Sequence, residues 1–401
     1  MRYIPICIFL CLVAISGCVT HSSERSSFRE FIEIGNGYED ISDLKEINGL
    51  PAFLATDSYR PAPRSAVGRF PTRSQNWFIV YNNEELGKNF ISIDYFTEID
   101  GKLTYVVSNY VHSADFDTFI VYDGKELGKT DSNYILVDSP TEVNRKLAYR
   151  ALRGTGNKYW NSSREGYVVV YDETEGRVYD DLQDLTAIND KLCYFAFNQS
   201  KWFLVCNDYE SENKYDGVVG PPIDVAGKVT YVAVNYLQTK AGYIQMKRFI
   251  VHDNQEIGKQ YDDASFPVEI NGSLAYLARQ GDKSFIVYNG EKYGGKYVDV
   301  NRPIQINARL AYSVGKDFEK GKFIVYDGQE IGKQYYSVRD PLEIKGKLTF
   351  VTYRENWTTF IVYGNQEIGK NYEWANYPTE IDDKLAFVAM RDGKVFVVME
   401  Q

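Results

Sequence analysis

Short apolar runs alternate with two-residue polar turns along most of the chain. Phe-Ile-Val-Tyr is followed by a turn and Glu-Ile-Gly-Lys, then by Pro-x-Glu-Ile, a second turn and Lys-Leu-Ala-Tyr-Val. Short runs of β-branched and aromatic residues between such turns are typical of β-strands. The residue that ends the Ile-Val-Tyr run recurs at intervals of 35 to 49 residues, at Tyr81, Tyr122, Tyr171, Cys206, His252, Tyr288, Tyr326, Tyr363 and Met399. The pattern predicts nine copies of one all-β unit.

Each unit reads as four strands, which we name a (Pro-x-Glu-Ile), b (Lys-Leu-Ala-Tyr-Val), c (Phe-Ile-Val-Tyr) and d (Glu-Ile-Gly-Lys-x-Tyr). The turns between a and b and between c and d, such as Asp100-Gly101 and Asp123-Gly124, suit type I′ hairpins. Strands b and c are apolar at nearly every position, so we expect both of their faces to be buried. These features predict the four-stranded blade of a β-propeller.

The two ends of the chain predict how the ring closes. The segment from Glu33 to Ile47 aligns without a gap on the segment from Glu330 to Ile344, so the fold begins on a strand d. It ends at Phe396–Met399, a strand c without a strand d after it. We therefore expect residues 29–401 to form a closed β-propeller of nine blades, in which the N-terminal strand completes the last blade and leaves no open edge.

The repeats resemble those of TolB-type periplasmic propellers, in which Asp-Gly-Lys-x-Leu-Ala-Tyr precedes an Ile-Tyr-Val strand. Asp100 to Tyr105 and Gly346 to Phe350 come nearest to that pattern. The Ser-Pro that precedes Asp-Gly-Lys in that family is missing throughout. The resemblance extends over the chain after residue 30 and implies the fold, but no particular partner.

The N-terminus has the features of a secretion signal. Arg2 is followed by an uncharged apolar stretch, Tyr3 to Ile15, which is too short to span a bilayer. Ile15-Ser16-Gly17-Cys18 resembles the lipobox of bacterial lipoproteins. This resemblance implies that residues 1–17 are a signal peptide and that Cys18 is lipidated (palmitate is one expected acyl chain), with residues 18–28 as a polar tether. An ordinary signal peptide is the alternative.

By the same resemblance to Gram-negative lipoproteins, Val19 favours sorting to the outer membrane, with the protein facing the periplasm. The net charge of −10 would repel phosphates, so we expect no nucleic-acid partner. Three His residues, none at ligand spacing from another, give no reason to expect a metal or another cofactor. We expect a monomer.

Two motifs have a functional and a structural interpretation. Gly124 to Thr130 is one residue short of a phosphate-binding loop, and its Glu-Leu/Ile-Gly-Lys recurs in other units, so we interpret it as part of a strand. The strand-a carboxylates could ring a central channel and hold a cation. Alternatively, each pairs with a turn lysine such as Lys102, Lys146 or Lys384. These carboxylates are Glu46, Glu98, Glu142, Asp224, Glu269, Glu343 and Glu380.

A binding site is expected on one face of the ring. Strands alternate in direction, so the minimal a–b and c–d turns share one face, and the b–c and d–a connections share the other. Three b–c connections are long, at 56–76, 150–165 and 235–248, and variable loops on a rigid scaffold are where function concentrates. Their basic and aromatic residues are the candidate binding residues, namely Arg60, Arg64, Arg69, Arg73, Arg153, Lys158, Trp160, Arg164, Lys240 and Tyr243. Neutralisation by the acidic d–a loops is the alternative.

From these observations we expect a lipid-anchored binding or scaffold module for an envelope protein or glycan. The alternative function is a propeller-type polysaccharide hydrolase that uses carboxylates of the loop face.

Two cysteines occupy facing positions of one unit. Cys193 replaces the small residue of strand b, and Cys206 replaces the tyrosine that ends strand c. The intervening turn is centred on Gln199 and Ser200, so positions 193 and 206 face each other across the hairpin. Facing residues lie within disulfide range, and the periplasm is oxidising, so we expect a disulfide. Two buried thiols are the alternative.

Overall fold

The fold was analysed in a computed structural model, which describes residues 31–56, 77–88, 90, 92–112, 115–128, 134–155, 163–238, 242–297, 299–317, 320–354 and 358–401. These residues contain strands, turns and irregular segments, and no helix. The strands form nine separate antiparallel sheets. The predicted nine-bladed all-β propeller is therefore confirmed.

The first five blades each consist of four consecutive strands. Their bounds are β2 (Asp40–Ile47), β3 (Leu50–Thr56), β4 (Phe78–Tyr81) and β5 (Glu84–Leu86); β6 (Ser92–Ile99), β7 (Lys102–His112), β8 (Asp115–Tyr122) and β9 (Lys125–Leu127); β10 (Tyr134–Val143), β11 (Lys146–Thr155), β12 (Ser163–Tyr171) and β13 (Thr174–Glu175); β14 (Asp181–Ile188), β15 (Lys191–Asn198), β16 (Lys201–Cys206) and β17 (Tyr209–Glu210); and β18 (Gly217–Val225), β19 (Lys228–Gln238), β20 (Ile244–His252) and β21 (Gln255–Ile257).

The last four blades follow the same order, but strand a is split in blades 7 and 8, and strand d of blade 9 comes from the N-terminus. Their bounds are β22 (Asp263–Ile270), β23 (Ser273–Gln280), β24 (Lys283–Tyr288) and β25 (Glu291–Tyr293); β26 (Asp299–Val300), β27 (Ile304–Ile306), β28 (Arg309–Asp317), β29 (Lys320–Tyr326) and β30 (Gln329–Ile331); β31 (Ser337–Val338), β32 (Leu342–Ile344), β33 (Lys347–Tyr353), β34 (Thr359–Tyr363) and β35 (Gln366–Ile368); and β36 (Trp374–Ile381), β37 (Lys384–Arg391), β38 (Lys394–Glu400) and β1 (Phe31–Tyr38).

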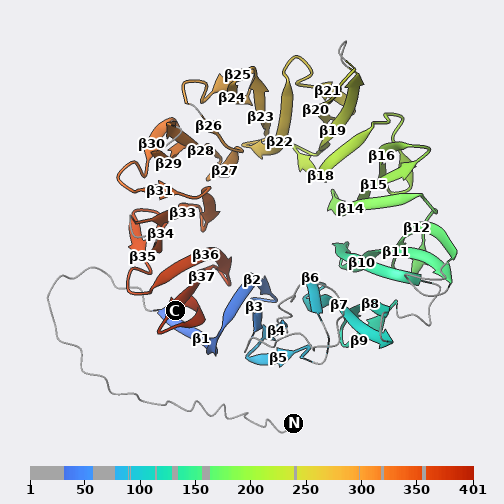
Figure 1. Ribbon diagram of the computed structural model, residues 1–401, viewed down its shortest axis with the longest axis horizontal. Coiled ribbons are helices and arrows are strands. Elements are labelled where there is room, and N and C mark those ends of the chain that lie inside the picture. The colour runs from blue at the N-terminus through green and yellow to red at the C-terminus, as the bar shows by residue number, and fades with distance from the viewer. Residues whose placement is uncertain are drawn as a thin grey trace, which may run out of the picture.

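The blades form a ring with strand a of each blade at the centre and strand d at the outside (Figure 1). The core consists of apolar side chains packed between neighbouring blades. One cluster joins Phe53 and Phe78 of blade 1 to Val388 and Val397 of blade 9, all of them buried. This packing explains why strands b and c are apolar on both faces.

The two-residue turns have the expected backbone conformation. Both central residues of the a–b and c–d turns have positive φ, for example 51° at Asp100 and 71° at Gly101, except in the turn Gly364-Asn365, where only the glycine does. This is the geometry of the type I′ turn. We call the face of the ring that carries these a–b and c–d turns the turn face. The opposite face, with the b–c connections such as 281–282 and the d–a connections, is the loop face.

The N-terminal strand closes the ring as predicted. β1 pairs with β38 in the register Phe31 with Glu400 and Ile34 with Val397. The Glu33 carboxylate accepts a hydrogen bond from Tyr372 Oη at 3.0 Å and forms an ion pair with Arg391 at 2.7 Å. Because Phe31 lies opposite the end of a strand c, the chain enters the ring at the turn face.

Strands a and d differ from their expected extents. Strand a begins earlier than Pro-x-Glu-Ile and contains a bulge, at which Ser139 and Asp184 have φ of 54° and 57°. In blades 7 and 8 the strand breaks at Arg302-Pro303 and Asp340-Pro341, whereas β10, β22 and β36 continue through the proline at the same place of the motif. Strand d ends before the Gly-Lys of its motif, as in Glu84–Leu86.

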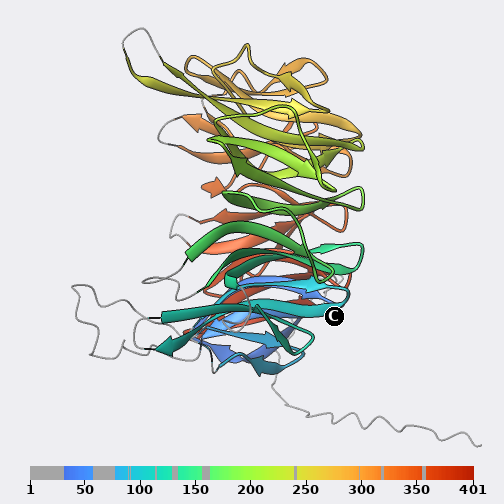
Figure 2. The same cartoon turned by 90° about the vertical axis from the view of Figure 1, so that its right-hand side faces the viewer.

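Two of the expected long b–c loops are largely extended hairpins. In blade 3, β11 and β12 reach Thr155 and Ser163, and in blade 5, β19 and β20 reach Gln238 and Ile244. The cross-strand ladder of blade 5 continues to the pair Gln238–Ile244. The resulting hairpin projects from the loop face (Figure 2). The prediction of loops was wrong there because polar residues in exposed hairpin strands do not interrupt the backbone ladder.

The register predicted for the two cysteines is confirmed, since Cys193 lies opposite Cys206 in the β15–β16 pair. Their Cα atoms are 4.2 Å apart, and the structure joins the two Sγ atoms in a disulfide. The cystine is packed among Phe195, Tyr231 and Phe249, between blades 4 and 5.

Candidate functional site

The strand-a carboxylates bind the backbone of the preceding blade. Glu98 Oε2 accepts the N–H of Asn48 at 2.6 Å, and Glu142 Oε2 accepts the N–H of Asp100 at 2.6 Å. Both donors lie in the a–b turn of the blade before. The same contact joins Glu269 to Ala226, Glu343 to Asn307, Glu380 to Lys345, Glu46 to Asp382, and Gln305 to Asn271. We call it the inter-blade turn contact.

Two blades use a different bond at this place. Blade 4 has Ala187, and blade 5 has the shorter Asp224, whose carboxylate accepts the N–H of Gly227 in its own turn. In both cases an asparagine of the preceding turn reaches forward. Asn144 Nδ2 donates to Asp190 O at 2.8 Å, and Asn189 Nδ2 donates to Gly227 O at 3.2 Å. Each pair of neighbouring blades therefore retains a polar link at the turn face.

The prediction that these carboxylates pair with turn lysines was wrong. Lys102 pairs with Asp123 at 2.9 Å, and Lys146 pairs with Asp172 at 2.5 Å, each across its own blade. Lys384 approaches Asp382 at 3.6 Å. Because the carboxylates are used between blades, the alternative of a cation-binding ring receives no support from the described residues, which contain no cluster of three potential metal ligands.

The Gly-Lys motif has a structural role in every blade where its contacts are described. Gly128 has a φ of +77°, and a Cβ there would lie 2.5 Å from Val137 of the next blade. Lys88 Nζ pairs with Glu85 at 2.6 Å and lies 4.3 Å from the ring centroid of Phe78. Lys259 and Phe249 repeat this arrangement at 4.8 Å. The interpretation of the motif as part of the blade agrees with these contacts.

The structure describes only part of the candidate basic surface. Arg153 has ion pairs with Glu165 at 3.4 Å and Glu175 at 3.5 Å, and Arg164 lies in β12. Arg248, in the third long connection, binds Asp263 at 2.5 and 3.1 Å. Arg153 and Arg248 are thus neutralised within the ring. Seven candidates and the lipidation residue lie outside the described residues: Arg60, Arg64, Arg69, Arg73, Lys158, Trp160, Lys240 and Cys18.

Tyr243 belongs to an exposed apolar tip of the blade 5 hairpin, at residues 235–238 and 242–247. The side chains of Tyr243 and Ile244 are 76% and 75% exposed, and Met246 is 51% exposed. Tyr236 faces Met246 across the ladder, so both lie on one side of the ribbon. The neighbouring strands β18 and β21 pair only with the base of the hairpin, up to Val234 and from Ile250. The tip is therefore a two-stranded ribbon that carries apolar side chains into solvent.

A cavity of about 580 Å³ lies in the inner wall of the ring. We call it the wall cavity. It is lined by residues of the innermost strands of blades 2 to 5 and of β7 and β8, namely Asp94, Tyr95, Val106, Ser108, Thr118, Leu136, Asp138, Ser139, Pro140, Thr141, Asp184, Leu185 and Pro221. Asp94 and Tyr95 are exposed, so the cavity communicates with solvent.

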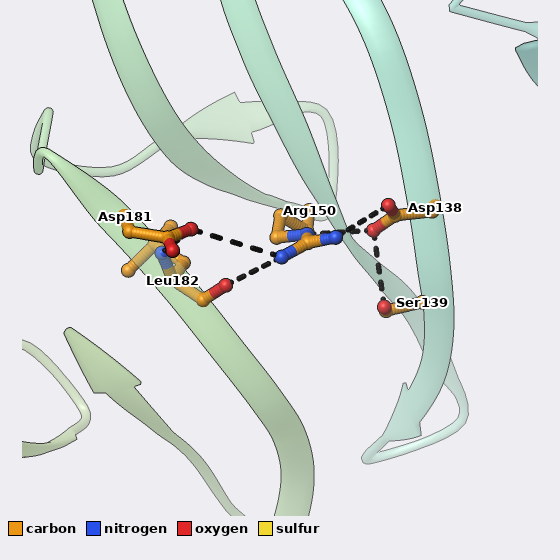
Figure 3. A network of polar contacts seen from close by, with 5 residues as sticks. All are labelled: Asp138, Ser139, Arg150, Asp181 and Leu182. Carbon is orange, nitrogen blue, oxygen red and sulfur yellow. Dashed lines mark hydrogen bonds and ion pairs between the residues drawn. The ribbon is translucent and has the colours of Figure 1, made fainter. Parts of the chain in front are cut away.

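One carboxylate of the wall cavity is held by an arginine of the next strand (Figure 3). Arg150 Nε and Nη2 bind the two carboxylate oxygens of Asp138 at 2.7 and 2.6 Å. Arg150 Nη1 also donates to Leu182 O of blade 4 at 2.6 Å and lies 3.9 Å from Asp181. This bidentate pair leaves Asp138 with little capacity for a further cation.

Among the described residues, no arginine or lysine is bonded to the other two carboxylates. Asp94 accepts hydrogen bonds from Ser92 Oγ at 2.7 Å and Ser108 Oγ at 2.8 Å. Asp184 has no hydrogen bond or ion pair with another described residue. Burial raises the pKa of the Asp184 carboxyl, and the Arg150 guanidinium opposes this rise. The wall cavity therefore carries an excess of negative charge.

Sequence reasoning missed Asp94, Asp138 and Asp184, because it searched the ends of strand a and the b–c connections. Asp138 and Asp184 flank or occupy a bulge, which bends a strand and changes the direction of its side chains. A usable signal was the pair of residues just before the Pro-x-Glu-Ile position, which varies between repeats while the motif itself recurs.

Comparisons with known proteins assign the chain to no family. No protein-family model matches the chain, and no curated protein matches it. The resemblances to lipoproteins and to TolB-type propellers therefore gain no support from a family match. In the described part of the chain, no helix has the length and apolar character of a membrane span.

Solved β-propeller structures are similar at low identity. The β-propeller domain of the trilobed protease from Pyrococcus furiosus is 14% identical, with 69% of this chain and 97% of that chain covered and a TM-score of 0.37. The acylaminoacyl peptidase of Pyrococcus horikoshii is 14% identical over 66% of this chain, has a TM-score of 0.36, and is matched over only 52% of its own length. A Trypanosoma rangeli sialidase mutant is 11% identical over 92% of this chain and 58% of its own, with a TM-score of 0.22. At such scores these likenesses carry no argument about activity.

Proposed function

We propose that the protein is a binding module of the cell envelope that recognises a partner protein through the apolar hairpin tip of blade 5. The exposed tip carries this proposal. Tyr236, Leu237, Tyr243, Ile244 and Met246 are between 45% and 76% exposed and follow one another at the end of one hairpin. Contiguous exposed apolar side chains mark interaction sites, whereas isolated ones are ordinary.

The free edges of the ribbon favour a protein over a glycan as the partner. Neither β18 nor β21 extends along the tip; the N–H of Tyr236 donates to the Asp216 carboxylate at 2.7 Å, and beyond it β19 and β20 pair only with each other. An extended segment of a protein can add to such an edge and bury the adjacent side chains. A glycan would offer no backbone ladder and little apolar surface.

The anchor proposed at Cys18 is compatible with this surface. The chain enters the ring at the turn face, where Phe31 lies opposite Glu400, and the hairpin leaves from the loop face. A lipid on Cys18 would therefore hold the turn face towards the outer membrane and leave the tip directed into the periplasm. Binding of a partner through the hairpin tip requires neither a second copy of the chain nor a cofactor.

One observation supports the alternative function of a hydrolase, but a second requirement of such an enzyme is not met. The raised pKa of Asp184 is the direction that a general acid needs. A glycosidase also needs a second carboxylate that is free to act as a nucleophile or base. Asp138 does not fill this role because Arg150 engages both of its oxygens, and Asp94 is bonded to the hydroxyl groups of Ser92 and Ser108 rather than paired with Asp184.

Capture of an envelope protein tests the proposal. The full-length protein, photo-crosslinked in cells from a residue of the tip, should yield one reproducible partner that mass spectrometry identifies. Tyr243→Ser, Ile244→Ser and Met246→Ser together should reduce the recovery of that partner at least tenfold, because the apolar contact is lost. The melting temperature should not change, since none of the three side chains is buried.

A matched control uses exposed apolar residues elsewhere on the ring. Leu50→Ser, Val178→Ser and Tyr209→Ser remove side chains that are 38%, 43% and 68% exposed. Capture should survive these changes. Equal capture by the two triple variants would refute the role of the tip. Loss of capture in Arg64→Glu with Arg69→Glu, but not in the tip variant, would favour the basic loop instead.

A further inference from the structure

The wall cavity is a second surface, distinct from the hairpin tip, and lies on the inner side of blades 2 to 5. Four innermost strands (β6, β10, β14 and β18) contribute to it, together with β7 and β8. The bulge residues Ser139 and Asp184 both line the cavity with left-handed backbone conformations. The bulges in strand a of blades 3 and 4 therefore shape one wall of the cavity.

The charge of the cavity is not balanced by its own residues. Of the three lining carboxylates, Asp138 is neutralised by the bidentate Arg150, which is also bonded to Leu182 O. Asp94 accepts hydrogen bonds only from the hydroxyl groups of Ser92 and Ser108 among the described residues. Asp184 forms no ion pair with another described residue, and the charge of Arg150 acts on it only through space. Two negative charges remain for a ligand.

One other cation, Lys45, lies beside the lining residue Tyr95 and is already engaged. Its Nζ donates to Phe96 O at 3.0 Å and lies 4.5 Å and 4.7 Å from the ring centroids of Tyr95 and Phe96. Lys45 belongs to β2, the innermost strand of blade 1, and is not among the lining residues. The excess charge at Asp94 and Asp184 is therefore not removed by this lysine.

The remaining walls are apolar. Val106, Leu136 and Leu185 supply aliphatic surface, and Pro140 and Pro221 supply ring edges. Methylene groups pack against such walls, and an aliphatic chain with a charged head keeps the head near water or a counter-charge. Tyr95 is 42% exposed, but the Lys45 ammonium already lies 4.5 Å from its ring centroid, so the two carboxylates rather than this ring would hold the charge of the ligand.

We propose that the wall cavity binds an aliphatic ammonium or guanidinium group, with Asp94 and Asp184 as its counter-charges and the apolar walls around its methylene chain. Either a basic side chain of a peptide or a free polyamine presents this chemistry. A neutral saccharide matches the hydroxyl and aspartate groups but leaves the excess charge in place. The proposal is independent of the partner of the hairpin tip.

Titration calorimetry of the purified full-length protein tests the proposal with two probes, spermidine and N-acetyl-lysine methylamide. We expect saturable binding of at least one of them, which weakens severalfold when sodium chloride rises from 50 to 500 mM, because the pair is partly solvent-exposed. Tighter binding of spermidine would identify a free polyamine as the source, and tighter binding of the lysine derivative would identify a peptide.

Two variants link binding to the named carboxylates. Asp94→Asn with Asp184→Asn should weaken the affinity about tenfold or more, since two charge contacts are lost. Asparagine also adopts the left-handed backbone that residue 184 requires, so the fold should be kept. Asp392→Asn makes the same change in an exposed turn and should leave the affinity unchanged.

Three results would overturn the proposal: no saturable binding of either cation by the folded protein, binding that the double variant retains, or binding that is insensitive to salt. A neutral probe, N,N′,N″-triacetylchitotriose, completes the test. Salt-independent binding of this trisaccharide without binding of the cations would assign the cavity to saccharides instead. If the double variant unfolds, the salt dependence of the wild-type protein still decides the proposal.

Discussion

At the scale of single residues, one carboxylate position shows how the blades are joined. Six glutamates and one glutamine accept a backbone N–H from the preceding turn, and the blades without them use a forward-reaching asparagine. Since Gln305 forms the same contact as Glu98, at the same distance of 2.6 Å, the bond rather than the negative charge is what the fold requires.

This comparison predicts the effect of replacing Glu98. Glu98→Ala removes the acceptor for Asn48 N–H and should lower the free energy of unfolding by about 0.5–1.5 kcal/mol. Glu98→Gln should be nearly neutral, because glutamine already serves this purpose in blade 7. Urea denaturation followed by tyrosine and tryptophan fluorescence measures both variants. An equal loss of stability in the two variants would show that the charge matters.

At the scale of the secondary-structure elements, β1 differs from every other strand because it completes a blade from the far end of the chain. It covers the edge of β38, and its residues Tyr38 and Ile34 belong to the cluster that joins blades 9 and 1. Glu33 adds bonds to Tyr372 and Arg391, and Lys394 pairs with Glu39 at 2.7 Å. β1 thus stabilises both the edge of β38 and the interface between blades 9 and 1.

Deletion of Glu33 to Ile41 should therefore expose the edge of β38 and open the interface between blades 9 and 1. We expect a lower melting temperature and aggregation, since an unpaired strand edge pairs with other chains. Differential scanning calorimetry and light scattering measure these effects. Deletion of residues 19–28, the proposed tether, removes a segment of similar length and should leave the melting temperature unchanged. Wild-type melting of the first deletion would show that the ring closes by other contacts.

At the scale of the whole molecule, the two faces of the ring differ in construction. The turn face consists of two-residue turns linked from blade to blade, whereas the loop face carries the extended hairpins and long connections. A tether at Phe31 leaves the turn face next to any membrane that holds the N-terminus. The loop face is then the side available to partners.

The lipid anchor proposed at Cys18 predicts in which cell fraction the protein is found. Cys18→Ser should release the protein from the membrane fraction or block its processing, because the acyl chains that would hold it attach to this cysteine. Membrane fractionation and intact mass measure the two outcomes. Cys11→Ser, which changes a cysteine of the expected signal peptide, is the control and should alter neither. Unchanged fractionation and mass in Cys18→Ser would refute lipidation at this residue.

The sequence by itself determined the repeat, the four strands of each unit, the type I′ turns, the closing role of residues 33–41 and the opposition of Cys193 and Cys206. These features depend on local rules. A two-residue turn sets the register of its hairpin, so facing positions follow from counting, and nine repetitions average out the ambiguity of any single strand. The lengths of the hairpins in blades 3 and 5 were less predictable, because polar exposed strands resemble loops.

Only the tertiary structure decided which groups meet between blades. The partner of Glu98 lies 50 residues away in another sheet, and the wall cavity combines strands of four blades. Such contacts depend on the stagger and angle between neighbouring sheets, which side-chain packing sets and no hairpin register encodes. The bulges at Ser139 and Asp184, which shape the cavity, also depend on how neighbouring sheets pack. The chain's own pattern therefore specifies each blade, whereas the packing of blade against blade decides where a ligand can bind.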